Sequence, residues 1–389
     1  MPENFGFHLP TRIEYAAGLI EESGKQISQL TKGREVLVVT DRGVKETGIC
    51  DRIINSLHKE GFSATVFEQV EPNPKDKDCE KGSEMARQLG ADLIVAVGGG
   101  SVIDSAKAIA LLQTRQGPLS SHAGANKITG AITPLAAVPT TAGTGSEVTR
   151  SAVITDTKRK IKMTIKDVAL APKLALVDPE TTYSLPAGLT ASTGMDALVH
   201  AIEAYTCRQA NPLSDALALA AIEKIYPALP VAVRDGSNKL ARNDLMSGSL
   251  MAGLAFSHAD VGAVHCMAEA IGSLYDTPHG VANSMFLPVV TAFNARFDPE
   301  RHARVASICG LAVNNLTAEK KALLLVEKLK QLSAEINIPE FASLSQANPA
   351  DFEYLAEISA ANGSSLSNCR PIKKSDYLKL FQDCYNRRG

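Results

Sequence analysis

The strongest constraint on the fold of this chain is a change of sequence pattern about halfway along it. In the first half, short apolar and β-branched runs such as Glu35–Asp41 alternate with segments of helical periodicity such as Val44–Glu60. From Pro186 to Arg388 the periodicity is helical almost throughout. Alternating strands and helices predict a parallel sheet covered by helices on both faces. We therefore predict an α/β domain over residues 1–185 and an all-helical domain over residues 186–389.

Other segments continue this pattern. Helices are expected at 78–89 and 101–112, and strands at 63–67, 92–97, 132–138, 150–154, 161–165 and 174–177. The strands on either side of residues 155–160 fit a hairpin. The most apolar helical run, Leu213–Val233, is interrupted by Asp215, Glu223 and Lys224, which argues against a membrane span.

The charge pattern limits the kinds of partner. The 389 residues include 40 Lys and Arg and 42 Asp and Glu, a formal net charge of -2, without long blocks of like charge. Neither a nucleic-acid surface nor a membrane surface is indicated. The start of the chain lacks the basic and apolar regions of a signal peptide. Seven cysteines without CxxC spacing indicate neither a disulfide framework nor a zinc–thiolate site. We expect a cytoplasmic protein.

The residues from Thr193 to Tyr205 are expected to form a helix that is capped by Ser192 or Thr193. Asp196 and His200 are four residues apart, so a carboxylate and an imidazole lie on one face, one turn apart. This pair has two interpretations. It is either half of a metal site or an Asp that orients a His inside an apolar helix.

Two more histidines, His265 and His279, lie downstream in apolar segments. A lone polar ring is costly in such surroundings. Together with Asp196 and His200 they supply one carboxylate and three imidazoles, a ligand set suited to a first-row divalent metal ion. The second pair of histidines therefore favours the metal site over the simple orienting pair.

A glycine triplet between the strand 92–97 and the next helix is a candidate phosphate site. Gly98, Gly99, Gly100 and Ser101 let the backbone approach a ligand and direct free N–H groups at it, with Asp104 in the same motif. The same glycines are also able simply to close a tight connection between strand and helix.

A second loop, after the strand 132–138, carries hydroxyls and glycines suited to the ribose and phosphates of a dinucleotide. Its candidate contacts are Thr140, Thr141, Thr144 and Ser146. Two such loops favour a dinucleotide ligand, although the GxGxxG fingerprint is absent. The first strand ends at Asp41, whose carboxylate is suited to accept from the ribose of NAD and to repel the 2′-phosphate of NADP. The alternative is that Asp41 only caps the following turn.

Together, these motifs resemble the iron-containing (group III) alcohol dehydrogenases, whose fold is shared by glycerol dehydrogenase and dehydroquinate synthase. The resemblance covers nearly the whole chain and rests on the joint occurrence of GGGSVIDSAK, PTTAGTGSEVT, the helix 194–205 and PHGVANSMFLP. It implies a dehydroquinate synthase-like architecture, with a Rossmann-like parallel sheet that binds NAD and an all-helical domain that binds metal. It also implies a homodimer or a higher homo-oligomer.

The resemblance implies roles for particular residues as well. The four residues of the metal site are implied to bind the catalytic ion, which by the family's habit is Fe²⁺, with Zn²⁺ or another divalent ion as the alternative. Asn73 and Lys162 are implied to contact the dinucleotide beside the two loops. Glu269 is a departure, because many members carry a second histidine there that relays protons or contacts substrate. A proton-transfer role for Glu269 is therefore one expectation, and a purely structural role is the other.

The expected activity is reversible hydride transfer between a small primary alcohol or diol and NAD(H), with a metal that polarises the substrate oxygen. A lyase of the dehydroquinate synthase type would need basic residues near the metal, yet the segments around the expected ligands contain no Lys or Arg. A non-catalytic nucleotide- or metal-binding protein is disfavoured because four ligands and two loops are all retained. The substrate is not identified by the sequence, although Leu254, Phe256, His258 and Val261 are expected to shape its pocket.

Overall fold

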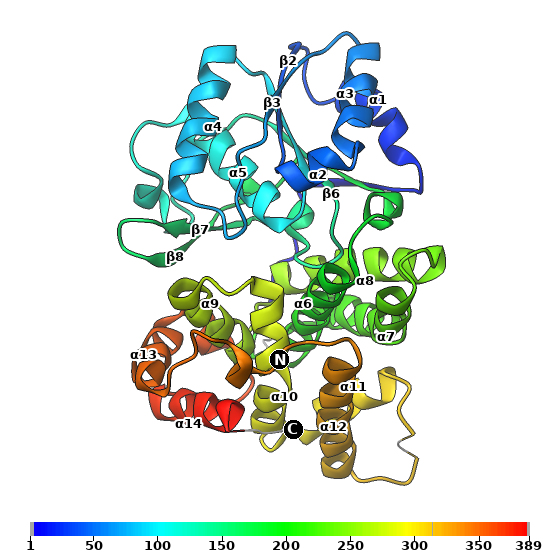
Figure 1. The fold of residues 1–389 in the computed structure, drawn as a ribbon, viewed down its shortest axis with the longest axis vertical. Coiled ribbons are helices and arrows are strands. Elements are labelled where there is room, and N and C mark those ends of the chain that lie inside the picture. Colours follow the sequence, from blue (N-terminus) through cyan, green and yellow to red (C-terminus); the bar gives the residue numbers. More distant parts are fainter. Residues whose placement is uncertain (1–3, 313, 387–389) are drawn as a thin grey trace. The chain divides into compact units, whose positions relative to one another are not determined.

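The computed structural model describes residues 4–312 and 314–386. The chain divides into two compact units (Figure 1). The first, His8–Leu185, is called the α/β unit below. The second contains the described residues from Pro186 onward together with residues 4–7, and is called the helical unit.

The α/β unit is built on a six-stranded sheet in which every pairing is parallel, in the order β1-β9-β6-β4-β2-β3. The strands are β1 (Arg12–Tyr15), β2 (Glu35–Val39), β3 (Ser63–Phe67), β4 (Leu93–Gly98), β6 (Leu135–Pro139) and β9 (Leu174–Val177). The predicted parallel sheet is confirmed. The edge strand β1 was not predicted from the sequence, because it has only four residues and none of them is buried.

Helices cover both faces of this sheet. They are α1 (Ser23–Ile27), α2 (Arg42–Glu46), α3 (Ile49–Lys59), α4 (Asp76–Leu89) and α5 (Gly100–Thr114). Leu37 and Val39 of β2 pack in one apolar cluster with α4 and α5, whereas Val36 and Val38 pack in a second cluster with α3. The side chains of successive residues of β2 thus point to opposite faces of the sheet and pack in different cores, as the two-residue period of a strand requires.

One predicted helix is in fact two. The segment Val44–Glu60 was expected to be continuous, but Gly48 between α2 and α3 has φ 78° and ends the first helix. A left-handed residue cannot continue a right-handed helix, and glycine adopts this conformation without steric cost. The helical spacing of the isoleucines from Ile49 onward belongs to α3 alone.

A small second sheet has the order β5-β8-β7 and contains β5 (Gly124–Ala125), β7 (Ser151–Asp156) and β8 (Ile161–Lys166). Strands β7 and β8 are antiparallel, with Thr155 opposite Lys162. The predicted hairpin is therefore present, with its turn at residues 157–160.

The described residues of the helical unit form helices and no strands, as predicted. The α-helices are α6 (Ala187–Thr206), α7 (Pro212–Arg234), α8 (Lys239–His258), α9 (Ala263–Tyr275), α10 (His279–Ala295), α11 (Pro299–Ile308), α12 (Ala318–Glu335), α13 (Phe352–Ala361) and α14 (Lys374–Tyr385). By length and composition α7 is able to cross a membrane, but it contains two prolines and packs against α6 and α8.

The predicted start of the central helix is wrong. Helix α6 begins at Ala187, directly after Pro186, and not at Ser192 or Thr193. The hydroxyl of Thr193 bonds back to the carbonyl of Leu189 four residues earlier, as a Thr inside a helix does. Tertiary packing overrides the weak helix propensity of the first turns, where Thr190 accepts from the buried Arg242 of α8.

Candidate metal centre and nucleotide loops

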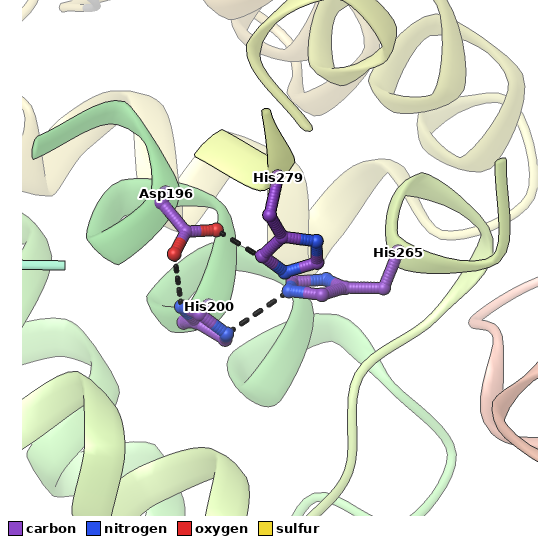
Figure 2. Close-up of side chains that lie close together, drawn as sticks. All are labelled: Asp196, His200, His265 and His279. Carbon is purple, nitrogen blue, oxygen red and sulfur yellow. Dashed lines mark hydrogen bonds and ion pairs between the residues drawn. The ribbon is translucent and has the colours of Figure 1, made fainter. Parts of the chain in front are cut away.

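The four predicted metal ligands lie together in the helical unit. Asp196 and His200 come from successive turns of α6, His265 from the first turn of α9, and His279 is the first residue of α10 (Figure 2). Each of the four offers a ligand atom within 4.8 Å of the others. The folding of three helices therefore brings side chains that are up to 83 residues apart into one cluster.

The distances between the ligand atoms suit one small ion. Nε2 of His200 lies 3.0 Å from Nε2 of His265, and Nε2 of His279 lies 3.7 Å from Oδ1 of Asp196. Ligands at about 2.1 Å from a tetrahedral ion are about 3.4 Å from one another. The two observed separations lie on either side of that value.

Burial and charge also suit a cation at the cluster. Asp196, His200 and His265 are each at most 4% exposed. Nδ1 of His200 has no hydrogen-bond partner within the described part of the chain. Burial lowers the pKa of His200 to about 4. Burial alone would raise the pKa of Asp196, but the neighbouring imidazoles hold it below its usual value. An ionised carboxylate beside a neutral imidazole is a donor set that fits a divalent ion.

Two neighbours hold the ligands in place. Nδ2 of Asn283, on the next turn of α10 after His279, lies 2.7 Å from Oδ1 of Asp196 and 3.1 Å from Nε2 of His279. Phe256 of α8 stacks on the ring of His200, with centroids 4.3 Å apart. Of the four residues expected to shape a substrate pocket, Phe256 thus lies against the cluster. His258 instead stacks on Phe7.

Glu203, like Asn283, lies at this site and was not predicted from the sequence. It lies on α6, three residues after His200, and is 4% exposed. Its Oε2 lies 2.6 Å from Nδ1 of His265. Burial lowers the pKa of His265, but the hydrogen bond and charge of Glu203, together with the charges of Asp196 and Glu269, raise it above the usual value. The only signal in the sequence was helical spacing, which places Glu203 one turn beyond a ligand.

Glu269 lies on α9, one turn after His265. Its Oε2 accepts a hydrogen bond of 2.7 Å from Nδ2 of Asn362. This bond gives the carboxylate a structural partner, in keeping with the second expectation for Glu269. Its role in proton transfer stays a prediction.

Gly280 allows α10 to approach α6 beside the four predicted metal ligands. A Cβ atom at Gly280 would lie 2.5 Å from the backbone oxygen of Ser192 and 3.5 Å from Cβ of Asp196. The first contact is with backbone, so it is relieved only if the start of α10 moves away from α6. Because His279 precedes Gly280, that movement would displace a ligand.

We predict that Gly280→Ala lowers bound metal and destabilises the protein by about 1–3 kcal/mol, the usual cost of overpacking. Metal content by mass spectrometry and the thermal unfolding midpoint measure the two effects. Gly188→Ala is the matched control, because a Cβ at this position of α6 meets nothing within 4 Å. Equal metal content in both variants would show that the close approach at Gly280 does not position His279.

The two glycine-containing loops of the α/β unit also lie together. They follow β4 and β6, which are adjacent parallel strands, so both lie at the carboxyl edge of the sheet. A Cβ atom at Gly99 would lie 3.1 Å from Thr141, and one at Gly100 would lie 2.5 Å from Thr144. The glycines of one loop therefore make room for the threonines of the other.

A buried lysine of α5 donates hydrogen bonds to the second loop and to the residues that follow it. Nζ of Lys107 on α5 donates to the hydroxyls of Ser146 and Thr149, at 2.8 and 3.0 Å. The hydroxyl of Ser146 also donates to Asp104, at 2.5 Å. Asp104 and Ser146 thus have internal partners that join α5 to the loop, and their contact with a dinucleotide stays a prediction. The contacts of the buried Lys107 with this loop were not predicted from the sequence.

The remaining predicted nucleotide contacts are placed as follows. Asp41 follows β2 and caps α2, with its Oδ1 accepting from the backbone N–H of Val44 at 2.9 Å. The capping role considered as an alternative is therefore present. Nζ of Lys162 donates to Oδ1 of Asn73 at 2.9 Å, so two residues separated by 89 positions lie side by side. Gly98 is the last residue of β4, Ser101 is the second residue of α5, and Thr140 directly follows β6.

Two family models match most of the chain, one in each unit. The iron-containing alcohol dehydrogenase model matches residues 10–179, and the model described as Fe-containing alcohol dehydrogenase family, C-terminal, matches residues 190–385. The 1,3-propanediol dehydrogenases of Citrobacter freundii and Klebsiella pneumoniae are 41% and 40% identical over 383 residues, which cover 98% of this chain and 99% of each relative. A crystal structure of 1,3-propanediol oxidoreductase superposes with a TM-score of 0.95 at 38% identity, over 98% of this chain and 100% of that one.

The chain belongs to the iron-containing alcohol dehydrogenase family. It is an oxidoreductase that uses a metal and NAD(H) to interconvert alcohols and carbonyl compounds. This assignment favours the dehydrogenase over both alternatives, the lyase and the non-catalytic binding protein.

Proposed function

We propose that the chain oxidises short primary alcohols or diols with NAD, and reduces the matching aldehydes, at a divalent ion held by Asp196, His200, His265 and His279. The convergence of these four side chains from three helices is the observation that carries the proposal. The substrate class is supported by the names of the two relatives, both of which are 1,3-propanediol dehydrogenases.

The four proposed ligands determine the net charge of the site and the room left for substrate. One carboxylate and three neutral imidazoles leave a divalent ion with one net positive charge and a free coordination position, since metals of this kind accept five ligands. A bound ion supplies Lewis acidity toward the substrate oxygen, and the nicotinamide accepts or donates hydride. Asn283 and Phe256 keep Asp196 and His200 oriented. We propose Fe²⁺ as the native ion, while Zn²⁺ binds such ligands more tightly.

Removing one imidazole tests the proposed ligand set. We predict that His279→Ala lowers metal affinity and kcat/KM by more than about 100-fold, because even the loss of a residue that only supports a ligand costs 10- to 100-fold. The variant should still bind NADH, since the proposed nucleotide loops belong to the α/β unit. His58→Ala on the exposed side of α3 is the control. A His279→Ala protein with one equivalent of metal and full activity would contradict the assignment.

The proposed dinucleotide site is the carboxyl edge of the parallel sheet, at the loops after β2, β4 and β6. Helix α5 begins at Gly100, directly after Gly98 and Gly99, and no side chain caps it. The free backbone N–H groups of such a helix start are suited to bind phosphate. The contact between the two loops and the buried Lys107 support a preformed site. We also propose a cytoplasmic homo-oligomer, with neither nucleic-acid nor membrane partners.

Asp41 is the proposed selector of NAD over NADP. Its Oδ1 caps α2, and its charge would repel a 2′-phosphate at the end of β2. Asn is as good a cap as Asp, so Asp41→Asn keeps α2 intact and removes only the charge. We predict that this change moves the ratio of kcat/KM for NAD to that for NADP by about tenfold or more toward NADP, the scale of a charged hydrogen bond.

Asp51→Asn on α3 makes the same charge change at an exposed position and is the control for Asp41→Asn. Its cofactor ratio should equal that of the wild type. If Asp41→Asn leaves the ratio unchanged as well, or if the wild type already prefers NADP, then Asp41 only caps α2.

A further inference from the structure

The carboxylate of Glu203 makes its contacts at the start of α9, the helix that carries His265. Its Oε2 lies 2.6 Å from Nδ1 of His265 and accepts from the backbone N–H of Gly262 at 3.0 Å. Its Oε1 accepts from the backbone N–H of Val264 at 2.8 Å. A single buried side chain of α6 thus contacts both the backbone and the ligand side chain in the first turn of α9.

The contact between Glu203 and His265 determines which ring nitrogen carries the proton. An ionised carboxylate has no proton to donate, so a hydrogen bond of 2.6 Å requires hydrogen on Nδ1 of His265. In the neutral ring, Nε2 then keeps its lone pair. That atom lies 3.0 Å from Nε2 of His200, within the ligand cluster.

The start of α9 is shaped for this carboxylate. Asn368 accepts from the backbone N–H of Ala263 at 3.1 Å, so Glu203 and Asn368 together satisfy donors that a helix start leaves without partners. A Cβ atom at Gly262 would lie 2.9 Å from Oδ1 of Asn368 and 3.0 Å from Oε1 of Glu203. The absence of a side chain at Gly262 is what lets the carboxylate approach, and the positive end of the helix dipole favours its charge.

We propose that Glu203 is the positioning residue of the metal centre: its carboxylate holds His265 as the Nδ1–H tautomer, so that Nε2 is free to bind the ion, and it fixes the first turn of α9 to α6. The inference rests on the proposed metal role of the four-residue cluster. Glu203 binds neither the ion nor the substrate in this arrangement, and it acts through His265 and the first turn of α9.

Glu203→Gln separates this role from packing alone, because the two side chains have nearly the same shape. A glutamine has only one acceptor oxygen and presents an NH₂ group in place of the other. If the NH₂ group faces His265, it donates to Nδ1, and the proton of the neutral ring must then lie on Nε2, where it competes with the ion. Facing Val264, it would leave that backbone N–H without its acceptor.

The test measures Zn²⁺ affinity by competition with a chromophoric chelator, in the wild type, Glu203→Gln and Asn368→Ala. Asn368→Ala removes a cap of the same helix turn without a contact to His265, and is the control for helix capping. We expect Glu203→Gln to bind Zn²⁺ 10- to 100-fold more weakly, the usual effect of losing the partner of a ligand histidine. Asn368→Ala should stay within about threefold of the wild type, although it lowers the thermal unfolding midpoint.

Unchanged Zn²⁺ affinity in Glu203→Gln would overturn the positioning role. An equal loss of affinity in Glu203→Gln and Asn368→Ala would also overturn it, because the loss would then come from helix capping. A wild type that binds no Zn²⁺ at the cluster would instead contradict the proposed function.

A measurement on the wild type tests the tautomer without any change to Glu203. In Zn²⁺-loaded protein labelled with ¹⁵N-histidine, the ring of His265 should show a proton on Nδ1 and a metal-bound Nε2. Comparison with His265→Gln identifies the signals. A His265 ring that binds Zn²⁺ through Nδ1 would overturn the proposal, even if Glu203→Gln does not fold.

Discussion

The helical unit depends on gathering one carboxylate and three imidazoles into one cluster, in which Asp196, His200 and His265 are buried and His279 is partly exposed. Asp196 and His265 are each at most 4% exposed, and a buried charge without a partner is strongly destabilising. The fold meets this cost with the imidazoles, with Asn283 and with the pairing of Glu203 and His265. Because the four predicted ligands come from α6, α9 and α10, the packing of these three helices also sets the geometry of the predicted metal site.

In the α/β unit, side-chain contacts likewise hold two loops in place at the edge of the sheet. Two loops that follow adjacent parallel strands pack glycine against threonine, and Lys107 fills the space beneath them with three hydrogen bonds. Burial lowers the pKa of Lys107, and the nearby carboxylates of Asp104 and Glu147 act in the opposite direction. These internal contacts hold the two loops in shape, which would reduce the entropy lost when a dinucleotide binds at the proposed site.

Much of this arrangement could be predicted from the sequence because the signals were local. The four-residue spacing of Asp196 and His200, the alternation of strands and helices, and the glycine triplet after β4 all follow from short-range geometry. The pairing of Glu203 with His265 spans 62 positions, and that of Lys162 with Asn73 spans 89, so periodicity could not find either. The early start of α6 and the break at Gly48 were missed for another reason: packing and one left-handed residue decided them, not helix propensity.

We propose above that Asp196 and three imidazoles bind one divalent ion. X-ray absorption at the iron edge, on protein loaded with Fe²⁺ without oxygen, tests it most directly. We predict a first shell of nitrogen and oxygen at about 2.1 Å, with the outer-shell scattering of three imidazole rings. Sulfur in the first shell, or a shell without imidazole scattering, would contradict it.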